Sequence, residues 1–269
     1  MNAIDETFAR LRRNGRKAFI PFVTAGDPDL TTTAAVVNAL AGEGADLIEI
    51  GFPYSDPIAD GPVIQASYMR ALGAGTRVRD VLKAVENRKM GQTPLVAMIS
   101  CSLVHRAGGE KFFAQAQACG FSGAILPDLP MEEAGALAAS ARAMDFKLIQ
   151  LVTPTTPPER ARKIIQLSSG FVYCVSVRGV TGGRSELPEE LPAQLRRLRA
   201  ESELPVCVGF GIGRPQQALK LCEFADGIII GSALVKLLDT GRPPHEIAGE
   251  VAGLAHQFAE AIHDAKATD

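Results

Sequence analysis

Acidic side chains gather at the end of one predicted strand. Glu49 interrupts the apolar run at 47–50, and Asp56 and Asp60 follow in a loop whose prolines exclude a continuous helix. A carboxyl group in an apolar strand is unfavourable unless it is paired or protonated. We therefore expect Glu49 to be either compensated or used for chemistry. A buried acid with a raised pKa beside an ionised loop acid can supply a proton donor and a charge stabiliser at one site.

Each of these two acids also has an ordinary structural explanation. Glu49 can be a structural acid tied to a neighbouring cation, and Asp60 can be an exposed or helix-capping loop residue. Their closeness in sequence favours a functional pair over either explanation alone.

Two glycine-containing segments indicate an anion site. GFGIG at 209–213 follows the predicted strand 206–208, and Gly231 with Ser232 follows the strand 227–230 and opens a helix. Barrels commonly bind phosphate after strands seven and eight, through backbone N–H groups and a helix N-terminus. Glycines that only mark tight turns are the alternative. A dinucleotide site is disfavoured, because no acid about twenty residues further on completes that pattern.

The segment RGVTGGR at 178–184 has the glycines and polar residues of a mobile lid. Tyr173 precedes it on a predicted strand. An ordinary surface loop and a core tyrosine are the alternatives. The four histidines show no metal-ligand spacing. Two of them, His256 and His263, share one helix face, and we expect both at the surface.

Eight short apolar segments alternate with helical patterns along the chain, which favours a closed (β/α)8 TIM barrel of the α/β class. A helix at 4–13 precedes the first strand, and residues 1–269 are expected to form a single barrel domain. An open doubly wound sheet is the alternative. The predicted strands are 18–24, 47–50, 95–99, 123–126, 147–152, 171–177, 206–208 and 227–230.

Composition excludes several classes of protein. The 269 residues carry a net charge of −2, so no basic excess favours nucleic acid or an anionic membrane. No segment reaches the roughly 18 apolar residues that a membrane span needs. The charged start of the chain does not resemble a signal peptide. The 5 scattered cysteines suit reduced thiols in a cytoplasmic protein.

Five motifs together resemble the tryptophan synthase alpha chain family over nearly the full length. They are PFVTAGDP at 21–28, LIEIGFPYSDPIADGPVIQ at 47–65, PDLP at 127–130, GVTG at 179–182 and GFGI at 209–212. The resemblance implies a lyase that cleaves indole-3-glycerol phosphate to indole and glyceraldehyde 3-phosphate by a retro-aldol step, in tryptophan biosynthesis. It implies no cofactor or metal. It also implies a beta subunit partner, in an α2β2 assembly, that takes up the indole.

The resemblance also implies roles for individual residues. Glu49 corresponds to the catalytic acid/base, Asp60 to the acid facing the indole nitrogen, and Tyr173 to an active-site tyrosine. Thr181 corresponds to a lid threonine that contacts Asp60. The implied substrate-binding residues are Phe22, Ile64, Thr181, Gly182, Phe210, Gly211, Gly231 and Ser232.

The third predicted strand departs from the family pattern. Ser100 and Ser102 stand where the family usually has a tyrosine and an asparagine beside the face that meets the beta subunit. We expect an altered partner contact there. Two other functions stay open: another phosphate-binding barrel, such as phosphoribosylanthranilate isomerase or indole-glycerol-phosphate synthase, or a subunit that mainly regulates a beta partner. The synthase would need a catalytic lysine at a strand end, where this chain has Glu49.

Overall fold

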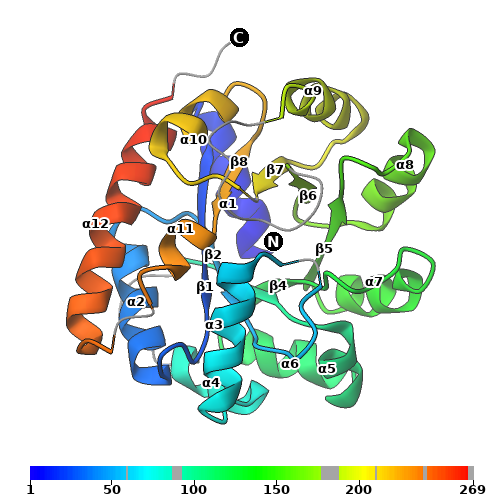
Figure 1. Ribbon diagram of the computed structural model, residues 1–269. Coiled ribbons are helices and arrows are strands. Elements are labelled where there is room, and N and C mark those ends of the chain that lie inside the picture. Colours follow the sequence, from blue (N-terminus) through cyan, green and yellow to red (C-terminus); the bar gives the residue numbers. More distant parts are fainter. Residues whose placement is uncertain (59, 87–92, 177–187, 210, 239–240, 266–269) are drawn as a thin grey trace.

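Eight parallel strands form a closed barrel in which each strand pairs with the next and β8 pairs with β1 (Figure 1). The computed structural model describes residues 1–58, 60–86, 93–176, 188–209, 211–238 and 241–265. The strands are β1 (Ala18–Thr24), β2 (Ile48–Gly51), β3 (Leu95–Met98), β4 (Phe121–Ile125), β5 (Lys147–Val152), β6 (Val172–Val175), β7 (Val206–Gly209) and β8 (Gly227–Ile230). The predicted (β/α)8 barrel is confirmed, and the open sheet is excluded by the pairing of β8 with β1.

Helices surround the barrel and connect its strands (Figure 1). The strand sequences are nearly continuous apolar runs, because the strands of a parallel barrel are buried on both faces. All of β1, including Phe22, is buried. The helices are α1 (Ala3–Arg13), α2 (Leu30–Gly42), α3 (Pro62–Gly73), α4 (Val78–Glu86), α5 (Cys101–Arg106), α6 (Glu110–Ala118), α7 (Ala134–Ala143), α8 (Pro158–Leu167), α9 (Leu191–Glu201), α10 (Pro215–Leu221), α11 (Ser232–Val235) and α12 (Pro244–His263).

The predicted additional helix, α1, lies at the end of the barrel where the strands begin. The Phe8 ring contacts the ring of Phe171, just before β6, with centroids 5.8 Å apart. The Asn2 side chain caps α1 and donates to the carbonyl of Ser122 near the start of β4. This end of the barrel is thereby covered, and the opposite end, where the strands finish, is left for a site.

An ion pair ties α3 to the loop after β1. Asp27 is fully buried and accepts hydrogen bonds from Arg70 at 2.9 and 2.6 Å and another from Ser67. A buried carboxylate needs such partners, because its charge has left water. Asp27 therefore fixes the position of the helix that begins directly after Asp60 and Gly61.

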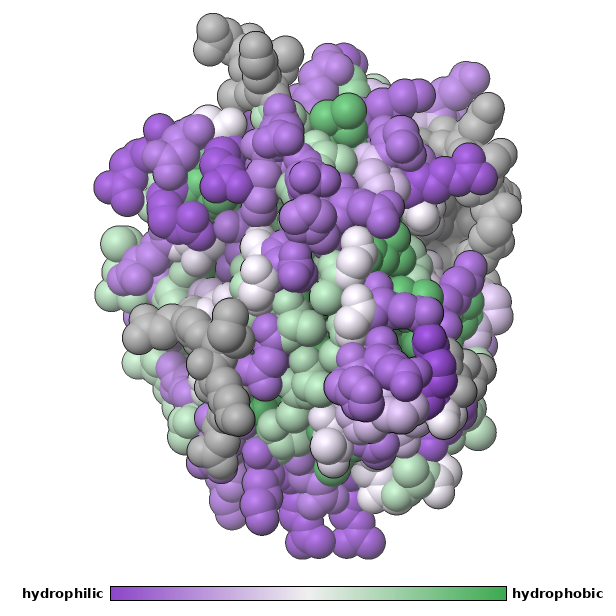
Figure 2. Space-filling model, turned by 90° about the vertical axis from the view of Figure 1, so that its left-hand side faces the viewer, coloured by the Kyte–Doolittle hydropathy of each residue, from purple (hydrophilic) through white to green (hydrophobic). Residues whose placement is uncertain are grey.

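The outer surface is mainly polar. Figure 2 shows the side of the molecule on which α12 lies, with hydrophilic residues over most of it and a narrower band of apolar residues near the middle. This is the expected pattern for amphipathic helices whose apolar stripes face a barrel. No helix among the described residues is long and apolar enough to cross a membrane.

One histidine prediction is wrong. His256 is exposed, but the His263 side chain is only 14% exposed, and its Nε2 lies 2.8 Å from Asp46 Oδ2. Asp46 also accepts from the backbone N–H of Phe19. The end of α12 thus packs against the starts of β1 and β2, which the helical spacing of the two histidines does not reveal.

Candidate active site

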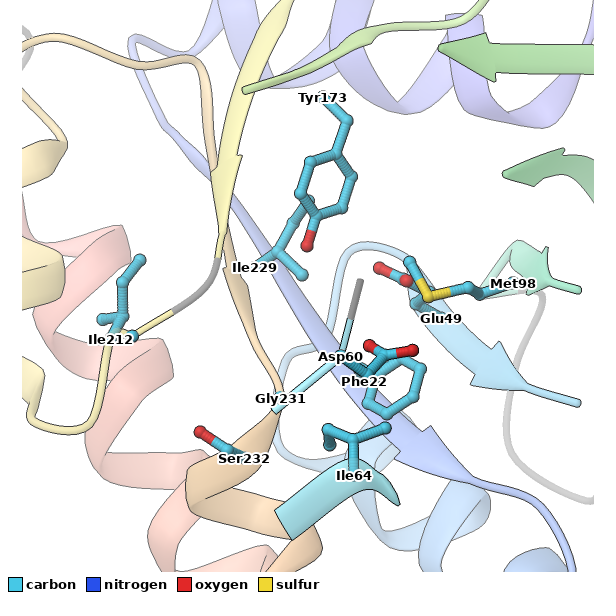
Figure 3. Close-up of a pocket in the computed structure, with 11 residues that line it drawn as sticks. Phe22, Glu49, Asp60, Ile64, Met98, Tyr173, Ile212, Ile229, Gly231 and Ser232 are labelled. Carbon is cyan, nitrogen blue, oxygen red and sulfur yellow. The ribbon is translucent and has the colours of Figure 1, made fainter. Parts of the chain in front are cut away.

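A pocket opens at the end of the barrel where the strands finish, and about 430 Å³ of space, part of it open to solvent, lies between its lining atoms. Figure 3 shows the carboxyl groups of Glu49 and Asp60 and the hydroxyl of Tyr173 pointing toward one shared space. The lining residues are Phe22, Glu49, Asp60, Ile64, Met98, Tyr173, Gly211, Ile212, Ile229, Gly231 and Ser232.

Glu49 projects from β2 into this pocket. Its Cα pairs with that of Phe22 on β1, and it is only 1% exposed. Neither carboxyl oxygen has a hydrogen-bond partner among the described residues. Burial, with a smaller effect from the neighbouring Asp60 charge, raises the pKa of Glu49 from 4.5 to about 8. Glu49 is therefore mostly protonated at pH 7 and can donate that proton to a molecule in the pocket.

Asp60 reaches the same pocket from the loop between β2 and α3, and it is 4% exposed. Burial raises its pKa from 3.8 to about 6, and the nearby Tyr54 hydroxyl acts in the opposite direction. Asp60 therefore ionises before Glu49 as the pH rises. Between about pH 6 and pH 8 the pocket holds a neutral acid and a carboxylate, the arrangement expected from the sequence.

Tyr173 brings a hydroxyl into the pocket from β6, and Gly209 makes room for it. A Cβ on Gly209 would lie 2.9 Å from Tyr173 Cζ, closer still to the hydroxyl oxygen, and 3.0 Å from Ile229 Cβ. Any larger residue at the end of β7 would displace the tyrosine. Burial, followed by the nearby Glu49 and Asp60, raises the pKa of Tyr173 well above its ordinary value, so its hydroxyl stays protonated.

The glycine segments after β7 and β8 line the other side of the pocket. Gly211 has a φ of +75°, a conformation that favours glycine, and Gly231 directly precedes the first turn of α11. Figure 3 shows Ser232 and Ile212 on the side away from Glu49. The pocket thus has a carboxyl end and a glycine-lined end, which suits a ligand with an anionic group remote from the reacting atoms.

The structure brings together all the predicted site residues that it describes. These are Phe22, Glu49, Asp60, Ile64, Tyr173, Gly211, Gly231 and Ser232. Predicted residues Thr181, Gly182 and Phe210 lie outside the described residues. The described residues contain no cluster of three or more His, Cys, Asp or Glu side chains that could hold a metal ion.

Sequence reasoning missed three lining residues. Met98 is the last residue of β3 and pairs with Gly51, two residues after Glu49, so strand alternation places its side chain on the same face as Glu49. Ile229 lies near the end of β8, and Ile212 lies in the glycine segment. The alternation of side chains along the predicted third strand could have identified Met98 as a lining residue. Ile212 lies in the glycine segment, where no periodic pattern indicates which side chains face the pocket.

Ser100 and Ser102 lie beside the PDLP motif, where the sequence predicts a partner contact. Ser100 is 3% exposed and caps α5, a short helix that the sequence pattern did not indicate. Asp128 accepts from the Ser100 hydroxyl at 2.6 Å and from the Cys101 N–H at 2.7 Å. Ser102 is exposed. Only one of the two serines therefore presents its side chain at the surface of the isolated chain.

Comparisons with known proteins agree on one family. The family model described as tryptophan synthase alpha chain matches residues 8–263. The tryptophan synthase alpha chain of Rhodopirellula baltica is 47% identical, with 97% of this chain and 99% of that protein covered. The one from Thermoanaerobacter sp. strain X514 is 42% identical, with 97% and 100% covered.

Solved structures give the same result. A chain of Mycobacterium tuberculosis tryptophan synthase superposes with a TM-score of 0.88 at 37% identity, covering 97% of this chain and 98% of that one. The tryptophan synthase alpha subunit of Legionella pneumophila superposes with a TM-score of 0.86 at 36% identity, covering 97% and 98%. The barrel, its pocket and these matches show that the chain belongs to the tryptophan synthase alpha chain family.

Proposed function

We propose that this chain catalyses the lyase reaction of its family, with Glu49 as the acid/base and Asp60 as the stabilising carboxylate. The reaction cleaves indole-3-glycerol phosphate to indole and glyceraldehyde 3-phosphate. The observation that carries the assignment is Glu49 itself, a buried acid with a pKa of about 8 and no hydrogen-bond partner among the described residues. Such a group is protonated and available where the substrate must receive a proton.

The reaction needs a proton at indole C3 and the loss of one from the adjacent glycerol hydroxyl. Glu49 would donate its proton to C3, which places positive charge on the indole ring. Removal of the hydroxyl proton by the resulting carboxylate then forms the aldehyde carbonyl. The C–C bond breaks, and its electron pair returns to C3 and restores the neutral ring. Glu49 ends the cycle protonated, so the acid is regenerated.

Asp60 and the glycine segments would provide the remaining interactions. The Asp60 carboxylate would accept the indole N–H and stabilise the positive charge that develops on the ring. The backbone N–H groups near Gly211, Gly231 and Ser232 would hold the phosphate. The apolar side chains of Phe22 and Ile64 would contact the flat ring between these two ends.

The direct test is release of indole from indole-3-glycerol phosphate by the purified chain, with and without a beta subunit. Cleavage in both samples is expected, with equal amounts of indole and glyceraldehyde 3-phosphate. A chain that stimulates a beta subunit but releases no indole would be the regulator considered above. Failure to cleave, with or without that partner, would overturn the assignment.

A beta subunit is the partner that family membership implies. We infer an α2β2 assembly in which the face near Ser102 contacts this partner less strongly than in relatives that keep the usual tyrosine and asparagine. Aromatic rings contribute much of the energy of protein interfaces, and an asparagine amide can both donate and accept hydrogen bonds there. Their loss typically weakens binding by roughly ten- to a hundredfold.

Two variants separate the serines. Ser102→Asn restores the exposed amide, and the double variant Ser100→Tyr with Ser102→Asn restores both groups. Because Ser100 caps α5, its replacement is expected to lower stability by about 1 kcal/mol. Thermal unfolding of each variant should therefore accompany calorimetric titration with a beta subunit that keeps the usual contacts. Tighter binding by the variants is expected, and equal affinities would show that these positions do not govern the contact.

A cytoplasmic location is part of the proposal. All five cysteines are thiols outside any disulfide, and Cys119 is the most accessible of them. Free thiols suit a reducing compartment. Cell fractionation that recovered the enzyme activity outside the cytoplasm would contradict this inference.

A further inference from the structure

The Asp60 carboxylate reaches the pocket from a loop, so the backbone of that loop determines where the carboxylate points. Asp60 is 4% exposed, and its buried carboxyl oxygen Oδ2 has no hydrogen-bond partner among the described residues. Aspartate is a short side chain whose first torsion is confined to staggered rotamers. A displacement of the Asp60 backbone is therefore passed on to the carboxylate.

Gln65 holds that backbone from α3. Its side-chain nitrogen Nε2 donates to the carbonyl oxygen of Asp60 at 2.8 Å and to that of Pro57 at 3.3 Å. An amide NH2 group carries two hydrogens, so these two bonds use both of them. The Asp60 N–H donates to the same Pro57 carbonyl at 3.0 Å. One side chain thus binds both the Asp60 carbonyl and the carbonyl that accepts the Asp60 N–H.

The helix that carries Gln65 is itself fixed to the barrel. Buried Asp27, after β1, accepts hydrogen bonds from Arg70 on α3 at 2.9 and 2.6 Å, and α3 also lies against β1 and α11. The ring of Tyr68 on α3 contacts the ring of Tyr54, near the start of the same loop, with centroids 5.3 Å apart. The helix therefore supports the loop near both of its ends.

Two adjacent residues of α3 serve the site in different ways. Ile64 is 6% exposed and lines the pocket (Figure 3). Gln65 is half-buried, and its side chain reaches back to the loop. Successive residues of a helix point about 100° apart, so one turn can supply both an apolar wall and a support for the loop.

We propose that Gln65 is a positioning residue, which holds the Asp60 backbone so that the carboxylate faces the indole N–H of the substrate. The proposal rests on the function proposed above, because that function assigns the carboxylate to the indole nitrogen. Gln65 is not among the described residues that line the pocket, so its effect must pass through Asp60. The effect should appear mainly in kcat, since the positive charge on the ring develops only as the proton reaches C3.

Gln65→Met keeps the length of the side chain and removes both donors. Gln117→Met is the matched control, because the half-buried Gln117 on α6 donates its Nε2 to the Met144 carbonyl at 2.9 Å, shortly before β5 begins at the opposite end of the barrel. Each variant loses a glutamine-to-carbonyl hydrogen bond, so each should lower Tm by roughly 2–4 °C. Gln65→Met should lower kcat by roughly ten- to a hundredfold and change KM by less than about threefold. The control should keep the kcat of the wild type.

Gln65→Glu gives a second variant at the same position. A carboxylate has nearly the shape of the amide but only accepts hydrogen bonds, so it would face two carbonyl oxygens without a donor. We expect its kcat to fall at least as far as that of Gln65→Met. A kcat within about twofold of the wild type in either Gln65 variant, or an equal loss in Gln117→Met, would overturn the proposal.

A double-mutant cycle tests whether Gln65 acts through Asp60. Single-turnover indole release is measured in the wild type, Gln65→Met, Asp60→Asn and the double variant. Gln65→Met should slow the wild type but slow Asp60→Asn by less than about twofold, because the group that Gln65 positions is already altered. The same fold-loss in both backgrounds would overturn the positioning role and leave the lyase assignment intact. If instead Asp60→Asn released indole at the full rate, the role given to Asp60 in the proposed function would fail, and the role of Gln65 with it.

Discussion

Glu49→Gln should make the protein more stable, and the gain should grow with pH. Burial raises the pKa of Glu49 from 4.5 to about 8, so the folded chain keeps a proton that the unfolded chain releases. Stability falls with rising pH wherever the folded state binds more protons. The unfavourable contribution of Glu49 is therefore absent below about pH 4.5, increases up to about pH 8 and is constant above it. Glutamine has no proton to release and lacks this dependence.

The size of the effect follows from the shift. One pKa unit corresponds to about 1.36 kcal/mol, so integration from pH 5 to pH 8 gives a stability difference that increases by roughly 3 kcal/mol. For a chain of this size, the Tm difference between Glu49→Gln and the wild type should therefore be roughly 5–10 °C larger at pH 8 than at pH 5. Catalytic residues often lower the stability of the folded protein, so their replacement commonly raises it.

Urea unfolding of wild type and Glu49→Gln at pH 5, 6, 7 and 8 measures the difference directly. Glu223→Gln is a suitable control, because Glu223 is exposed and its removal should change stability by less than about 0.5 kcal/mol at every pH. If residues 1–269 form one domain, as we propose, each protein should unfold in a single transition. A difference between wild type and Glu49→Gln that stayed constant from pH 5 to pH 8 would refute the raised pKa.

Other predictions concern the working pocket. The pH profile of kcat/KM should be bell-shaped, because activity needs Asp60 ionised, above about pH 6, and Glu49 protonated, below about pH 8. A flat profile from pH 5 to pH 9 would contradict these assignments. Gly209→Ala should retain the fold but lower kcat by at least roughly tenfold, because the added Cβ would displace the Tyr173 side chain. An unaltered kcat would show that the position of the tyrosine is unimportant. Inorganic phosphate should compete with substrate. Gly211→Leu should raise KM sharply, because leucine is strained at the positive φ of this position. An unchanged KM in Gly211→Leu would place the phosphate elsewhere.

The features that could be predicted from the sequence are those that depend on local pattern. Apolar runs and their order specify the barrel, and the end of each strand is readable to within a few residues. Glu49 stands out because a carboxyl group in such a run is rare. Asp60 and the glycine segments could be placed at the same end of the barrel, since the active sites of these barrels lie where the strands finish.

Contacts across the barrel could not be predicted in this way. The ring contact of Tyr54 with Tyr68 depends on the angle at which α3 leaves the loop, and no periodicity encodes that angle. The pairing of His263 with Asp46 joins residues 217 positions apart, so the helical pattern of α12 gave the wrong environment for the histidine. Ser100 could be recognised as unusual, but its role as a helix cap depends on the side chain of Asp128, 28 residues away in the sequence, and no local pattern indicates that contact.

The central claim is that Glu49 delivers the proton that begins cleavage. Single-turnover release of indole by Glu49→Gln, together with calorimetric titration of indole-3-glycerol phosphate, tests it most directly. Because glutamine keeps the shape of the side chain but cannot donate that proton, we expect substrate to bind with a Kd close to that of the wild type and no indole to be released. Indole release at a rate near that of the wild type would contradict the account.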